Sequence, residues 1–160
     1  MRKIIKYRDG YRYQLAEGVS CGVPLFPGRY IDIGFVQLST SGDLTIRAGY
    51  AWDGPSGPTI DTPAAMRGSL LHDCIYQMLR AGALDQDCRK IADEIYYDTC
   101  LEDVAATADR MRESGTLGKI AADIYETAAR VRFAGHFGAL RLFGGKAASP
   151  TSERRILTAP

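Results

Sequence analysis

The stretch AWDGPSGPTIDTP, residues 51–63, separates two parts of the chain with different residue patterns. Its prolines and glycines exclude regular helix and strand. Before it, apolar and polar residues alternate in short runs, and after it apolar residues recur every three or four positions. We therefore predict an α+β fold, with a small antiparallel sheet over about residues 1–52, a Gly/Pro loop, and a bundle of about three helices over about residues 63–143.

The β part carries two turn signals. The dipeptide DG at positions 9–10 lies between alternating runs and predicts a hairpin. The segment TSGD at positions 40–43 predicts a second turn. Between them Ile31, Ile33 and Phe35 alternate with other residues, so we expect one buried strand face and about four short strands in all.

The helical part has clear boundary signals. The first helix should run over about 63–80, with Asp61 or Thr62 as N-cap and Gly82 as its stop. The second should begin near Asp85 and continue past Cys100.

Gly115 and Gly118 are predicted to interrupt the chain before a third helix over about 117–134. The apolar stripe of that helix consists of Leu117, Ile120, Ile124, Ala128, Val131 and, more loosely, Phe133. Residues 1–145 are expected to form one domain, with 146–160 as a flexible or docking tail through which copies of the chain could oligomerise.

Composition narrows the function classes. A net charge of +1 gives no argument for a nucleic-acid partner. No apolar run reaches 18 residues, so no transmembrane segment is expected. No signal-peptide pattern is present, which predicts synthesis in the cytoplasm. The four cysteines include no CxxC pair and are expected to be thiols.

A histidine and two acids stand out in the first two helices. Antiparallel packing of helices joined by a short turn would bring Asp93 to the height of His72. A carboxylate there would fix the imidazole tautomer, as a general base requires. Tyr76 shares a helix face with His72 and would support the pair.

Asp73 must point to another side, towards the Gly/Pro loop. Together with Asp53 or Asp61 and loop carbonyls it would form an oxygen-rich site suited to Ca²⁺. The alternative is structural: His72 and Asp93 would hold two helices together, and Asp73 would only pair with a neighbouring arginine.

The segments HDCIY and ADEIYYDTC resemble the two catalytic helices of phospholipase A2, over about residues 66–101. The resemblance implies that His72 is the base for water, Asp73 the calcium carboxylate, Asp93 the orienting acid and Tyr76 a supporting hydroxyl. The family's usual calcium loop is replaced by DGPSGP, and the cysteine after the His-Asp pair stands one position early.

Over about residues 30–145 the chain also resembles an uncharacterised protein family of tailed phages and prophages. The matching residues are Asp53, Gly54, Ser56, Pro58, His72, Asp73, Tyr76, Arg89, Ala92 and Asp93. This resemblance implies synthesis in a host cytoplasm, association with the virion, and other phage particle proteins as partners.

Three hypotheses follow. The first is a phage-encoded, calcium-dependent hydrolase of phospholipid esters, with an open pocket at His72 and an apolar collar from Ile60, Leu84 and Phe137. The second is a non-catalytic head or tail accessory protein, with a closed, solvent-free His72. The third is a metal-dependent peptidoglycan or peptide hydrolase, which should show a polar groove.

Overall fold

The computed structural model describes residues 7–9, 12–55 and 62–150 and has the predicted α+β architecture, with strands first and helices after. In these ranges the strands are β1 Tyr7–Asp9, β2 Tyr13–Leu15, β3 Val19–Gly22, β4 Ile31–Asp32, β5 Val36–Leu38, β6 Asp43–Ile46 and β7 Ala51–Trp52. They form two antiparallel sheets of order β1-β2-β7 and β3-β6-β5-β4. The prediction of about four strands was too low, because turns divide the expected runs into shorter pieces.

Both predicted turns join paired strands. β1 pairs with β2 and β5 with β6, as the DG and TSGD segments indicated. The strand predicted through Phe35 is wrong, because β4 ends at Asp32. Gly34 has φ +89°, which breaks the alternation, and the Phe35 side chain is exposed. Val36 and Leu38 are buried in its place.

The helices in the described ranges are α1 Pro63–Arg80, the 3₁₀ turn η1 Gln86–Cys88, α2 Arg89–Arg112, α3 Thr116–Phe143 and the short α4 Gly145–Ala148. The predicted limits of α1 are confirmed. Thr62 is its N-cap, without a side-chain capping bond, and Asp61 lies outside the described residues. After α1, Gly82 has φ +66° and the Ala83 amide donates to the Met78 carbonyl at 2.9 Å, which closes the helix end.

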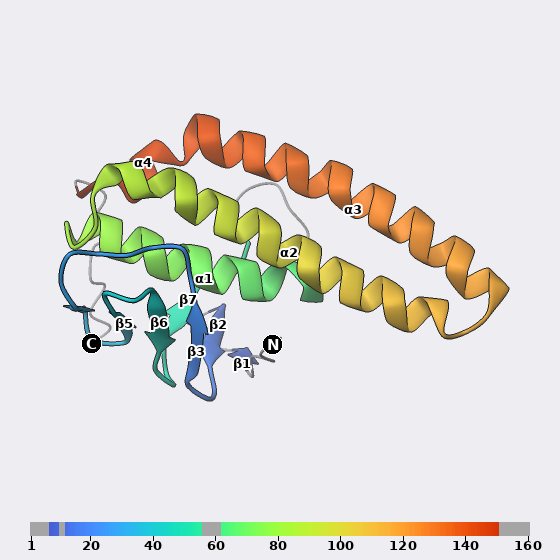
Figure 1. Ribbon diagram of the computed structural model, residues 1–160, viewed down its shortest axis with the longest axis horizontal. Coiled ribbons are helices and arrows are strands. Elements are labelled where there is room, and N and C mark those ends of the chain that lie inside the picture. The colour runs from blue at the N-terminus through green and yellow to red at the C-terminus, as the bar shows by residue number, and fades with distance from the viewer. Residues whose placement is uncertain (1–6, 10–11, 56–61, 151–160) are drawn as a thin grey trace.

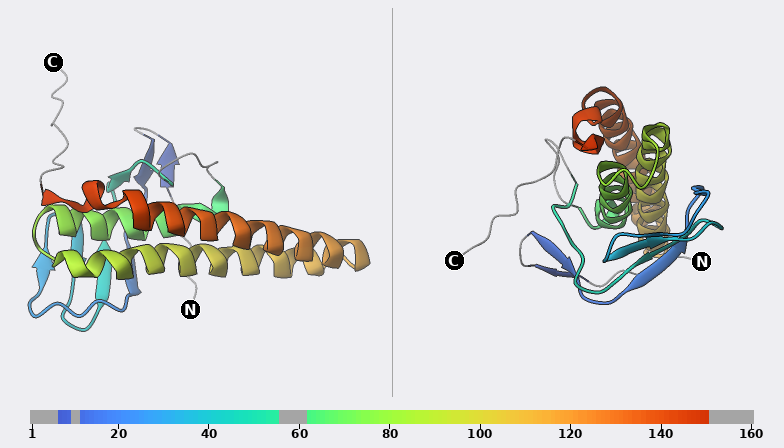
Figure 2. Two further views of the ribbon diagram at one scale, coloured as in Figure 1. Left: turned by 90° about the horizontal axis from the view of Figure 1, so that it is seen from above. Right: turned by 90° about the vertical axis from the view of Figure 1, so that its left-hand side faces the viewer.

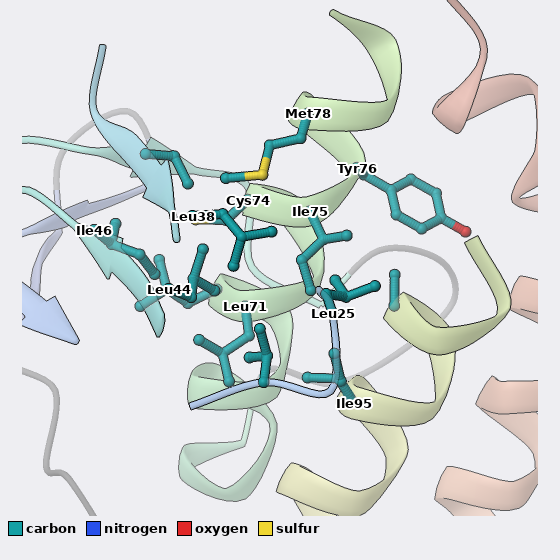
Figure 3. Packing of buried hydrophobic residues seen from close by; sticks show 14 of the residues in the cluster. Leu25, Leu38, Leu44, Ile46, Leu71, Cys74, Ile75, Tyr76, Met78 and Ile95 are labelled. Carbon is teal, nitrogen blue, oxygen red and sulfur yellow. The ribbon is translucent and has the colours of Figure 1, made fainter. Parts of the chain in front are cut away.

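The main core lies between the sheets and α1. Helix α2 packs on the other side of α1. Figure 3 shows Leu71, Cys74 and Met78 pointing from α1 towards the strands, whereas Tyr76 points away towards the other helices. No disulfide links the four cysteines, and Cys74 and Cys100 are buried thiols. The α1 side chains that face away from the sheets, such as Tyr76, therefore contact the other helices.

Helix α3 departs from the prediction in length and in orientation. It continues to Phe143, nine residues beyond the predicted end, and Gly118 lies inside it. A Cβ at position 118 would come within 2.0 Å of the Met111 carbonyl oxygen, so glycine lets α2 and α3 approach. The buried face of α3 consists of Gly118, Ala122, Ala129 and Phe133. Most of the predicted apolar stripe instead faces outward, with Leu117 exposing 82% of its surface, and Phe133 is its one buried member.

The α2–α3 pair extends well beyond α1 and the sheets (Figures 1 and 2). At the opposite end the described part of the expected tail packs on the domain: Ala148 is buried, and the Arg80 Nη1 donates to the Ala147 carbonyl at 3.1 Å. Among the described helices, none has the length and apolar character needed to cross a membrane.

Candidate functional site

A buried histidine–aspartate pair joins α1 to α2. His72 Nε2 lies 3.0 Å from Asp93 Oδ1, which confirms the contact expected from helix spacing. One turn earlier, Gly68 permits this approach, because a Cβ there would be 2.7 Å from Cys100 Sγ and 2.9 Å from the Tyr96 carbonyl oxygen. Close packing of α1 on α2 thus sets the distance of the pair.

The Asp93 carboxylate has no solvent exposure and is surrounded by donors. Tyr76 Oη donates to Oδ1 at 2.7 Å, and Arg141 Nη1 donates to Oδ2 at 2.8 Å. Arg89 Nη1 lies 3.8 Å from Oδ2. Burial raises the pKa of Asp93, but the hydrogen bonds from His72, Tyr76 and Arg141 outweigh it, so the net pKa is lowered. Asp93 is therefore a buried, ionised carboxylate.

Arg89 also fixes the end of α3. Its guanidinium donates to the Leu140 carbonyl at 3.0 Å and to the Arg141 carbonyl at 3.2 Å. A Cβ at Gly144 would come within 2.7 Å of Tyr76 Oη, so the chain passes close to the site there. The cluster therefore ties α1, α2 and α3 into one unit.

His72 lies between two acids. Its Nδ1 is 3.7 Å from Asp73 Oδ1, and its ring packs on Tyr76 with centroids 3.9 Å apart. Burial lowers the pKa of His72, but the carboxylates of Asp73 and Asp93 outweigh burial and raise the net pKa. His136, by contrast, has its pKa lowered by burial and by Arg132.

Titration of the two histidines, followed by NMR, should therefore give a pKa above the ordinary value of 6.5 for His72 and below it for His136. Because folded His72 holds its proton more tightly than the unfolded chain, its stabilisation is complete below pH 6.5 and is lost as the pH rises through the folded pKa. The stability advantage of the wild type over His72→Gln should shrink across that window. An advantage that grows with pH would contradict the assignment.

Two cavities meet at Asp73. A cavity of about 10 Å³, the size of one water molecule, is lined by Gly54, Ser69, His72, Asp73, Tyr96, His136 and Leu140. A cavity of about 380 Å³ is lined by Tyr50, Ala51, Trp52, Asp73, Gln77, Arg80 and Ala81. Asp73 thus borders both the histidine and a space large enough for a small substrate.

The calcium site expected from the sequence lies partly outside the described residues. Within residues 7–9, 12–55 and 62–150, no group of three or more His, Cys, Asp or Glu side chains could hold a metal ion. Asp53 and Asp73 are described, whereas Asp61 lies outside those ranges.

The hypothesis that Asp73 pairs with a neighbouring arginine does not hold for Arg67. The Arg67 Nη2 binds Asp103 at 2.9 Å and Glu102 at 2.8 Å instead. Asp73 makes its close approach to His72.

Other predicted residues are dispersed. Gly54 lines the small cavity, and Ser56 and Ile60 lie outside the described residues. Leu84 is buried in the main core and Phe137 packs on Tyr97, so these two do not form an exposed apolar collar.

Three residues near the site were not predicted as part of it. Arg141 reaches Asp93 because α3 continues past its glycines. His136 Nδ1 lies 3.0 Å from Tyr96 Oη, and both side chains line the small cavity. Extending the predicted third helix over residues 134–143 would have brought Arg141 and His136 to the site. Gly135 and Gly138 obscured the helical pattern of that stretch.

No family model matches this sequence, and searches of curated proteins and of solved structures find no significant match. The class of protein is therefore defined by the molecule itself: an α+β domain with a buried His–Asp pair clamped by Arg141.

Proposed function

We propose that this protein is a hydrolase in which the His72–Asp93 pair activates a water molecule. The proposal rests on the different surroundings of the two ring nitrogens of His72. Nε2 is held by Asp93, and Nδ1 lies beside Asp73, where both residues border a cavity the size of one water. A tautomer fixed by Asp93 leaves Nδ1 to accept a proton from that water.

The larger cavity would hold the substrate. Asp73, Gln77 and Arg80 line it from successive turns of α1. Arg80 would bind an anionic group of the substrate. A phospholipid supplies both an anionic phosphate and, beside it, ester bonds that water can attack. Attack by the activated water on the ester carbonyl would break the acyl–oxygen bond and release a carboxylic acid and an alcohol.

The test is release of fatty acid from phospholipid micelles by the wild-type chain, His72→Gln and His136→Gln. Because a general base contributes about 10²–10⁴-fold, His72→Gln should lose at least about 100-fold in kcat. His136→Gln, a variant of the other histidine at the small cavity, should retain most activity. Arg80→Gln should raise KM more than it lowers kcat. Equal activity of wild type and His72→Gln would exclude His72 as the base.

A second candidate is a non-catalytic phage particle component, as the phage resemblance implies. The observation in its favour is the enclosure of the site: His72 is only 5% exposed, and every buried side-chain nitrogen and oxygen among the described residues has a hydrogen-bond partner. In that case neither phospholipid nor peptidoglycan is hydrolysed, and His72→Gln lowers only the free energy of unfolding.

A further inference from the structure

The outward face of α3 is apolar over most of the length of the helix. We define the outer stripe as six exposed residues: Leu117, Ile120, Ile124, Thr127, Val131 and Ala134. Leu117 exposes 82%, Ile124 65% and Val131 72% of their surfaces. Since the opposite face of α3 already packs on α2, no described part of the chain covers this stripe (Figure 1).

The spacing of the outer stripe is that of a coiled-coil seam. Leu117, Ile124 and Val131 recur every seven residues, and Ile120 lies between the first two at the alternate seam position. Thr127 also occupies a seam position, and its hydroxyl already donates to the Asp123 carbonyl at 2.8 Å, so burial would leave no unpaired donor. Packing another helix on the stripe would therefore bury apolar side chains and leave no unsatisfied Thr127 hydroxyl.

We propose that the outer stripe is a self-association surface on which α3 of a second copy packs antiparallel. The proposed register places Ile124 opposite Thr127 of the second copy and Ile120 opposite its Val131. The inference does not depend on the proposed hydrolase function.

Charge complementarity supports this orientation. Asp123 and Arg130 flank the stripe on the same side, seven residues apart, and both are exposed. In an antiparallel pair the residues on that side face each other, so Asp123 meets Arg130 of the second copy and the pair occurs twice by symmetry. On the other side Ala121 meets Ala128. In a parallel pair Asp123 and Arg130 would face small residues and gain no partner.

The contact area is sufficient for a weak dimer. From Leu117 to Ala134 the stripe is about 26 Å long, and covering half the circumference of a helix over that length removes about 500 Å² per copy. The total of about 1,000 Å² is at the lower limit for specific interfaces, so we expect a dissociation constant on the order of micromolar. The sheets lie against α1, away from the outer face of α3, and do not obstruct the pairing (Figure 2).

Sedimentation velocity of the full chain in reducing buffer, over about 1–200 μM, tests the proposal. The wild type should form dimers. Ile124→Ser combined with Val131→Ser should raise the dissociation constant by about 100-fold or more. The melting temperature, measured at a concentration where the wild type is monomeric, should be unchanged because both residues are exposed. The matched control is Leu142→Ser with Phe143→Ser, a slightly more exposed apolar pair of α3 outside the paired region, which should dimerise like the wild type.

Charge exchange tests the orientation. Asp123→Arg and Arg130→Asp should each weaken self-association by about 10-fold or more, and a mixture of the two should form heterodimers in which every facing pair is opposite in charge. Asp123 also binds Arg112 of its own chain at 2.9 Å, and mixing restores association without restoring that bond.

A wild type that stays monomeric throughout, including one that binds lipid vesicles through α3, would overturn the proposal. So would a dimer that is indifferent to the Ile124 and Val131 substitutions. A dimer whose charge variants do not combine in the mixture would overturn the antiparallel register.

Discussion

Asp93→Ala is expected to lower the free energy of unfolding by about 3–5 kcal/mol, a large part of the total stability of a domain of this size. The substitution removes the acceptor shared by Tyr76, His72 and Arg141. The Arg141 guanidinium would then lose its carboxylate partner, and the imidazole would keep only Asp73, 3.7 Å from its other nitrogen. Desolvated groups that lose their partner cost more than the hydrogen bond itself contributed.

Urea unfolding of Asp93→Ala and of Asp98→Ala measures this effect. Asp98 lies on the same helix but is exposed, so its loss should change stability by less than about 0.5 kcal/mol. Equal midpoints for the two variants, at equal denaturant slopes, would show that the network around Asp93 does not stabilise the fold.

Phe133→Ala is the second large effect, and it tests which face of α3 is buried. Phe133 is 1% exposed and packs edge-on against Tyr96, with ring centroids 6.2 Å apart. Removing a buried phenyl ring leaves a cavity and costs about 3–5 kcal/mol. Thermal and urea unfolding should both show the loss.

Phe143 provides a control of the same residue type on the same helix. It is 78% exposed, and Phe143→Ala should change stability by less than about 0.5 kcal/mol. If instead Phe143→Ala were as damaging as Phe133→Ala, the buried and exposed faces of α3 would have to be exchanged.

The sequence was sufficient to predict the path of the first two helices and the contact between them. Pro63 and Gly82 mark the limits of α1 through local backbone preference, which does not depend on the rest of the fold. His72 and Asp93 stand at similar distances from Gly82, so any antiparallel pairing of these helices brings them together. Local geometry and short connections make such predictions possible.

Whether His72 is open or enclosed could not be predicted in the same way. Its enclosure depends on Tyr96 and His136, which reach the small cavity from α2 and α3. Arg141 approaches Asp93 from a residue 48 positions later in the chain. Contacts of this range depend on how three helices pack together, and residue spacing within one helix contains no information about them.

Local sequence signals are enough to predict that strands precede helices, where α1 begins and ends, and that His72 meets Asp93. The face of α3 that packs on α2 is known only from the folded chain. Hydrophobic periodicity favoured the face with Leu117 and Ile124, whereas the chain buries the face with Gly118 and Ala122. The physical reason is that small residues let two helices come close enough for dense packing, and an apolar stripe does not specify what will cover it.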